Sequence, residues 1–155
     1  MDETIEARLA RLGVELPTAA APAANYVPFA RHDGILFISG QLPLTAQGVS
    51  CSGRLGESVS VEEGRKAARL CAINVLAQAK AALDGDLERI RRILRTTNFV
   101  ASTADFSEHH LVANGASDFL VEALGERGRH ARAAVGVAAL PRGAAVEVDA
   151  IIAVD

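Results

Sequence analysis

The chain is poor in aromatic side chains: its 155 residues include five Phe, one Tyr and no Trp. Proteins that hold single-stranded nucleic acid stack the bases on aromatic rings along a basic groove. In this chain acidic side chains outnumber Lys and Arg, which gives a formal net charge of −3. The composition therefore disfavours nucleic acid as a partner.

Metal and cofactor motifs are also missing. His109 and His110 are adjacent, so a helix cannot point both rings at one metal ion, and the two cysteines form no metal motif. There is no phosphate-binding loop, dinucleotide fingerprint or Gly-x-Ser-x-Gly elbow. We therefore expect no metal and no cofactor, with Cys71 buried in a helix and Cys51 exposed in a loop.

No apolar segment approaches the roughly 20 residues that a helix needs to cross a bilayer. The first six residues are acidic where a secretion signal is basic. We expect a cytoplasmic protein with no membrane partner.

Hydrophobic residues make up 50% of the chain, whereas charged residues make up only 23%. A chain of this length forms one domain and buries roughly 70% of its unfolded surface without a disulfide or metal. Because so few charged side chains are available to cover a monomer, we expect some apolar surface to contact another subunit.

Hydrophobic spacing and turn residues predict the order helix, two strands, helix, strand, helix, two strands. Asp33-Gly34 between two apolar runs indicates a hairpin, and Ser60 with Glu63 forms a capping-box pattern. The predicted elements are a helix over 2–13, an extended linker over 16–24, strands over 26–31 and 35–39, a helix over 60–83, a strand over 93–101, a helix from Asp105 or Ser107 to 124, and a terminal hairpin over 132–155.

Residues 133–140 and 150–154 are apolar at successive positions, which is typical of strands buried on both faces. Two long helices can cover only one face of the mixed sheet. We therefore predict a homo-oligomer that packs sheets together.

Three charged residues stand out in this apolar terminal segment. Arg132 begins a predicted strand, and Glu147 and Asp149 share one face of the next. An arginine can bind a carboxylate with two hydrogen bonds, and an acid can activate a water molecule. The alternatives are a solvated arginine at a strand edge and ordinary outward-facing acids, and burial in a pocket would decide between them.

Several segments of the chain together form a specific pattern of order and spacing. They are Tyr26, Phe37–Pro43, Arg95–Val100, Asp105–Phe106, Asn114, Ala131–Ala133, Leu140–Pro141 and Val146–Ile151. In this order and spacing, the chain resembles the RidA/YjgF family. The resemblance covers residues 24–155 and leaves residues 1–23 as an N-terminal helix and linker extension.

The resemblance implies an α+β, chorismate-mutase-like fold, with a mixed β-sheet and two long helices packed on one face. It also implies a homotrimer with sites between subunits. The implied activity is hydrolytic deamination of reactive enamine/imine intermediates, such as 2-aminoacrylate and its imine tautomer, to a 2-keto acid and ammonia without a cofactor.

Carried over by position, Arg132 would hold the substrate carboxylate, and Glu147 would orient or activate the attacking water. The resemblance assigns substrate-binding roles to Tyr26, Ser39, Gly40 and Asn114.

This chain departs from the family pattern in three places. Ala134 stands where active imine deaminases often have cysteine, the segment 105–114 is longer than in compact members, and residues 1–23 add a helix and linker. These departures indicate a divergent subgroup. Two alternative functions stay open: a non-catalytic trimer that binds small carboxylate metabolites, and an endoribonuclease or translation inhibitor.

Overall fold

The computed structural model describes residues 3–22 and 24–155. The helices are α1 (Ile5–Arg11), α2 (Val61–Ala82) and α3 (His109–Leu124), with short 3-10 turns η1 (Leu87–Arg89), η2 (Gly125–Gly128) and η3 (Pro141–Gly143). The strands are β1 (Phe29–His32), β2 (Ile35–Gln41), β3 (Leu44–Thr45), β4 (Gly48–Val49), β5 (Ile90–Ala101), β6 (Ala131–Val137) and β7 (Val146–Val154).

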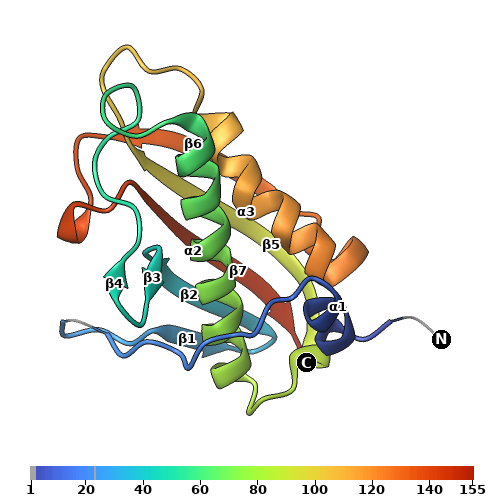
Figure 1. Cartoon of the computed structure of the whole chain (residues 1–155). Coiled ribbons are helices and arrows are strands. Elements are labelled where there is room, and N and C mark those ends of the chain that lie inside the picture. The colour runs from blue at the N-terminus through green and yellow to red at the C-terminus, as the bar shows by residue number, and fades with distance from the viewer. Residues whose placement is uncertain (1–2, 23) are drawn as a thin grey trace.

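Five strands form one mixed sheet in the order β1-β2-β7-β5-β6, in which only β5 and β6 run parallel. Helices α2 and α3 lie side by side across one face of this sheet (Figure 1). The predicted α+β fold, with two long helices on one face of a mixed sheet, is therefore confirmed.

Local signals fixed the start of α2. The Ser60 side chain accepts a hydrogen bond from the Glu63 N–H, and the Glu63 carboxylate accepts one from the Ser60 N–H, which completes the predicted capping box. Helix α3 instead begins at His109 after Glu108, with no side-chain cap. The predicted caps at Asp105 and Ser107 are thus wrong.

The first hairpin is confirmed, because His32 pairs with Ile35 across the Asp33-Gly34 turn. Asp33 adopts a left-handed conformation with φ of 51° there, which Asp tolerates in tight turns. The first strand begins at Phe29, three residues later than predicted. Helix α1 is shorter than predicted, and residues 16–22 form no helix or strand, as expected of a linker.

The predicted terminal hairpin is wrong. Strands β6 and β7 do not pair with each other; both pair with β5, which lies between them. The physical reason is that β6 is parallel to β5, and parallel neighbours need a crossover connection, here α3. After η3 the chain returns and β7 inserts between β2 and β5.

Burial alternates along β7: Val146, Val148, Ala150, Ile152 and Val154 are buried against the helices, and the intervening residues are half-buried. Within one chain, β7 is therefore buried on its helix-facing side only, and the predicted burial of the second face by another subunit stays a prediction. The sheet face opposite the helices, which we call the open face, carries Phe37, Phe99, Val135 and Ile151. Phe37 is 47% exposed there.

Cys71 is buried as predicted, whereas Cys51 is half-buried rather than exposed, because it packs against the edge of the core. None of the helices in the described ranges is long and apolar enough to cross a membrane.

Candidate active site

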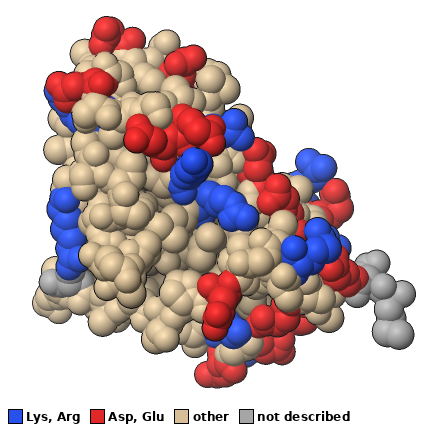
Figure 2. Space-filling view, viewed as in Figure 1, with Lys and Arg blue, Asp and Glu red and all other residues tan. Residues whose placement is uncertain are grey.

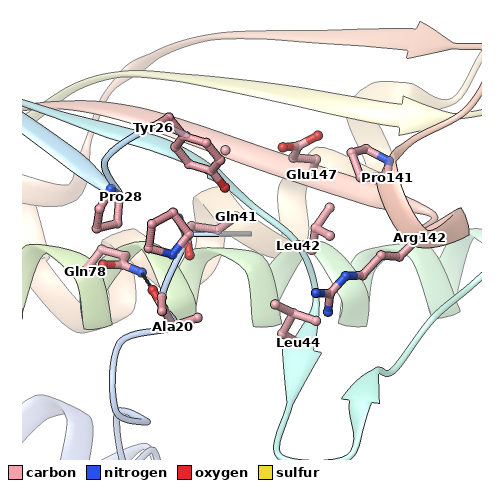
Figure 3. A pocket seen from close by; sticks show the side chains of 13 residues that line it. Ala20, Tyr26, Pro28, Gln41, Leu42, Leu44, Gln78, Pro141, Arg142 and Glu147 are labelled. Carbon is pink, nitrogen blue, oxygen red and sulfur yellow. Dashed lines mark hydrogen bonds between the residues drawn. The ribbon is translucent and has the colours of Figure 1, made fainter. Parts of the chain in front are cut away.

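A cavity of about 130 Å³ lies between the linker, the end of β2 and the start of β7. Three residues predicted from the sequence, Tyr26, Gly40 and Glu147, line it. Figure 3 shows Tyr26 and Glu147 at this cavity. The linker contributes Ala20, Ala21 and Pro22 to the same wall. The structure therefore brings half of the predicted site together in one place.

Glu147 is half-buried on the open face and lies against Gly40. A Cβ atom at position 40 would come within 2.9 Å of Glu147 Cδ, so a side chain there would displace this carboxylate. Burial, and secondarily the charge of Asp149, raises the pKa of Glu147. A carboxyl group with a raised pKa in a cavity is suited to proton transfer near neutral pH.

Asp149 is held in a structural contact, since its Oδ1 accepts a hydrogen bond from the Thr97 N–H at 3.1 Å. Ser39 also makes a supporting contact: its hydroxyl donates to the Val27 carbonyl at 2.8 Å. That bond ties the segment before β1 to β2, close to Tyr26, which is 49% exposed. Ser39 is not among the residues that line the cavity.

Arg132 lies on the other face of the sheet. Its pairing partner on β5, Thr96, also pairs with Ala150, which is buried against the helices, whereas Glu147 pairs with Phe99. Residues 96 and 99 point to opposite faces of a strand. One chain therefore does not bring Arg132 and Glu147 together.

The Arg132 guanidinium is held against α3. Nη1 donates to Ser117 Oγ at 3.0 Å, and Nη2 donates to the His110 carbonyl at 3.2 Å. Asn114, the remaining predicted residue, is half-buried on α3 within one helical turn of both partners. Arg132 and Asn114 thus form a second group, which is distant from the cavity in the same chain.

Two residues that line the cavity, Arg142 and Gln78, were not predicted from the sequence. Arg142 has a left-handed backbone with φ of 58° and makes no hydrogen bond or ion pair with the described residues. Its signal was the Pro-Arg-Gly turn just before β7. Gln78 donates from Nε2 to the Ala20 carbonyl at 2.8 Å, and its buried Oε1 has no partner in the described chain. Its polarity within the apolar stripe of α2 was the available signal.

Within residues 3–22 and 24–155, no three His, Cys, Asp or Glu side chains gather as metal ligands would.

The family model described as "YjgF/chorismate mutase-like, putative endoribonuclease" matches residues 6–150. The chain belongs to the YjgF family. The predicted resemblance is thereby confirmed over nearly the whole length of the sequence.

Three relatives of this YjgF-family chain are similar along most of their length. Protein TCP17 of Trypanosoma cruzi is 52% identical over 149 residues, which cover 96% of this chain and 92% of that one. The crystal structure of Atu1372 from Agrobacterium tumefaciens, of unknown function, is 52% identical with a TM-score of 0.92, over 97% and 92% of the two chains. A Shewanella oneidensis MR-1 structure, described as a "putative endoribonuclease", is 36% identical with a TM-score of 0.94, over 98% and 100%.

The structural likeness to a RidA protein is weaker. The RidA structure from the Antarctic bacterium Psychrobacter sp. PAMC 21119 is 25% identical, with a TM-score of 0.62 over 88% of this chain and 94% of that one. The fold is shared, but the lower score agrees with a divergent subgroup.

Proposed function

We propose that the protein hydrolyses reactive 2-imino acids, the tautomers of enamines such as 2-aminoacrylate, to 2-keto acids and ammonia. The observation that supports this most is Glu147, a carboxyl group with a raised pKa in a small cavity that also contains Tyr26 and Gly40. Membership in the family to which RidA proteins belong favours the same reaction.

The proposed site combines two chains. Glu147, Gly40 and Tyr26 come from one subunit, and Arg132 and Asn114 come from its neighbour. This division follows from the placement of Arg132 and Glu147 on opposite faces of the sheet. A guanidinium still has donors free for a carboxylate after its bonds to Ser117 and the His110 carbonyl.

The chemistry needs one proton-transfer group and a positioned substrate. Arg132 binds the substrate carboxylate, and the Glu147 carboxylate accepts a proton from water as the water oxygen attacks the imine carbon. The Glu147 carboxyl group passes this proton to the imine nitrogen, which gives the neutral carbinolamine. The carbinolamine hydroxyl then gives up its proton, through Glu147, to the amino nitrogen. The C–N bond breaks as the C=O bond forms, and ammonia and the 2-keto acid are released without a cofactor.

We propose a homotrimer, in which the open face of each subunit packs toward its neighbours. Exposed Phe37, beside Ile151 on the next strand, supports this, because a large apolar sheet face in water is unfavourable. Cyclic symmetry closes such an assembly. We further propose that residues 1–23 form an extension to the domain of residues 24–155, and that its linker narrows the cavity of about 130 Å³.

The test is a coupled assay in which a dehydratase generates 2-aminoacrylate and the release of pyruvate and ammonia is followed. The wild-type protein should accelerate release, and Arg132→Ala and Glu147→Gln should each remove most of the acceleration. Arg129→Ala is the matched control, since the Arg129 side chain is exposed and pairs with Glu126, and alanine keeps its backbone hydrogen bonds. No acceleration by the wild-type protein would defeat the proposed function, and full activity in Arg132→Ala would defeat the role of Arg132.

The alternative function, a non-catalytic binder of small carboxylates, makes different predictions. The coupled assay should show no acceleration by the wild-type protein. In a thermal melt, pyruvate should stabilise the wild-type protein but not Arg132→Ala.

Endoribonuclease activity is a second candidate, favoured by the description of the family model. Against it, acidic and basic side chains are interspersed over the helix-bearing face, and no continuous basic surface forms there (Figure 2). RNA cleavage that co-purifies with the protein and disappears in Glu147→Gln would support this candidate. Cleavage that separates from the protein on a sizing column would dispose of it.

A further inference from the structure

A chain of hydrogen bonds runs behind Arg132 and connects three elements. Arg132 Nη1 on β6 lies 3.0 Å from Ser117 Oγ on α3. Ser117 Oγ lies 2.9 Å from His130 Nε2, and His130 Nδ1 lies 2.5 Å from the Gly128 carbonyl oxygen of η2. None of these three partners has a role in the hydrolysis described above.

The hydrogen-bonding capacities of the groups fix most of the proton positions. A guanidinium only donates, so Ser117 Oγ accepts from Arg132. A carbonyl only accepts, so His130 Nδ1 carries a proton and donates it to Gly128. In a neutral His130, Nε2 is then an acceptor, and the Ser117 hydroxyl turns its hydrogen toward it.

The surroundings keep His130 in that form. Burial lowers the pKa of His130, the Gly128 carbonyl opposes this shift in part, and the positive charge of Arg132 lowers the pKa further. On α3 the contacting group is the uncharged Ser117 hydroxyl. These effects favour the neutral form of His130 over the charged form.

Packing against α3 holds the Gly128 end of this hydrogen-bond network in place. Gly128 is buried, and a Cβ atom at this position would come within 2.6 Å of the Leu120 carbonyl carbon. This close approach packs η2 onto the last turns of α3, so the Gly128 carbonyl cannot move without moving the helix.

We propose that His130, acting through Ser117, positions the Arg132 guanidinium for a ligand carboxylate. The proposal rests on the proposed role of Arg132. Both Nη atoms are already committed to α3, which fixes the plane and direction of the guanidinium. Bidentate recognition of a carboxylate depends on that direction, because both hydrogen bonds must align at once. His130 and Ser117 are positioning residues.

The variants that test the proposal are Ser117→Ala, His130→Leu and His130→Gln. The first two remove the acceptor for Arg132 or the acceptor for the Ser117 hydroxyl, and we expect each to lower kcat/KM about tenfold, mainly through KM. His130→Gln can place its amide oxygen near the position of Nε2, and should stay within about twofold of wild type. His32→Gln is the control, because its ring is exposed.

Three readouts separate positioning from a general structural role. In the Arg132→Ala background, His130→Leu should cause no further loss, since the position to be controlled is gone. The KM of wild type should rise as pH falls through the lowered pKa of His130, whereas the KM of His130→Gln should not. Nitrogen NMR of the histidine ring should show the Nδ1–H tautomer at pH 7 in wild type.

An unchanged KM in both Ser117→Ala and His130→Leu would overturn the proposal, as would an equal loss in the Arg132→Ala background. If the wild-type protein turns over no 2-imino acid, the proposed function fails, and the positioning role is then measured by pyruvate binding. Binding weakened about tenfold in Ser117→Ala and abolished in Arg132→Ala would support it. Equal pyruvate binding in all variants, or none in wild type, would overturn it.

Discussion

The contact between Gly40 and Glu147 gives a sharp test of the site, through Gly40→Ala. The added Cβ would lie 2.9 Å from Glu147 Cδ and 3.2 Å from Cγ, closer than ordinary van der Waals contact, so the carboxylate must turn away. A shift of about 1 Å in a reacting group lowers the rate by about 100-fold. This corresponds to about 2.7 kcal/mol of lost transition-state stabilisation.

The same substitution should change stability little. Glu147 faces a cavity, so its side chain can rotate at a cost of about 0.5–1.5 kcal/mol, which lowers Tm by about 1–6 °C. The assay is 2-imino acid hydrolysis with a thermal melt on the same sample. Gly34→Ala is the control, because it adds a methyl group at the opposite end of β2, 3.1 Å from the Val154 carbonyl oxygen. Wild-type kcat/KM in Gly40→Ala would refute the assignment of Glu147 as the proton-transfer group.

Three further predictions concern pH, assembly and packing. Burial and the charge of Asp149 raise the folded-state pKa of Glu147 above 4.5, so the free energy of unfolding falls as pH rises from 4.5 through that pKa. Glu147→Gln removes this charge, and thermal melts should show a higher Tm than wild type at pH 7 but not at pH 4. Phe37→Glu places a charge on the open face and should yield monomers in sedimentation measurements. Gly115→Ala brings a Cβ within 2.7 Å of the Arg65 carbonyl carbon between α2 and α3, and denaturant titration should show a loss of about 1–3 kcal/mol.

The features that the sequence predicted well are those that depend on neighbours along the chain. The capping box at Ser60 and the turn at Asp33 each depend on a few adjacent residues, so their patterns were sufficient. Helix α3 lacks such a local cap, and its predicted start was accordingly misplaced. Family motifs spread over the chain predicted the overall fold, which no single local pattern determines.

The pairing of β6 and β7 could not be predicted from their own residues. Two apolar strands separated by Pro141 and Gly143 have the pattern of a hairpin, and β5, which separates them, lies about 30 residues earlier in the sequence. The faces of Arg132 and Glu147 depend on this pairing, because both strands take their register from β5. The cavity residues Gln78 and Arg142 were missed for the same reason, since α2 and η3 meet only in the fold.

Arg132 and Glu147 lie on opposite faces of the sheet in one chain. The activity of a monomeric variant therefore tells whether the arginine that binds the substrate comes from another subunit. Strands β6 and β7, which carry the two residues, are separated by β5 and therefore lie about 10 Å apart. The Arg132 guanidinium also already donates hydrogen bonds to α3. If Arg132 binds the carboxylate of a substrate in the Glu147 cavity, it must belong to another copy, and the monomeric Phe37→Glu variant should be inactive. An active monomer would instead point to Arg142, the cation that lines the same cavity as Glu147 in one chain. In that case Arg142→Ala, rather than Arg132→Ala, would abolish turnover, and the carboxylate-binding role would move from β6 to η3.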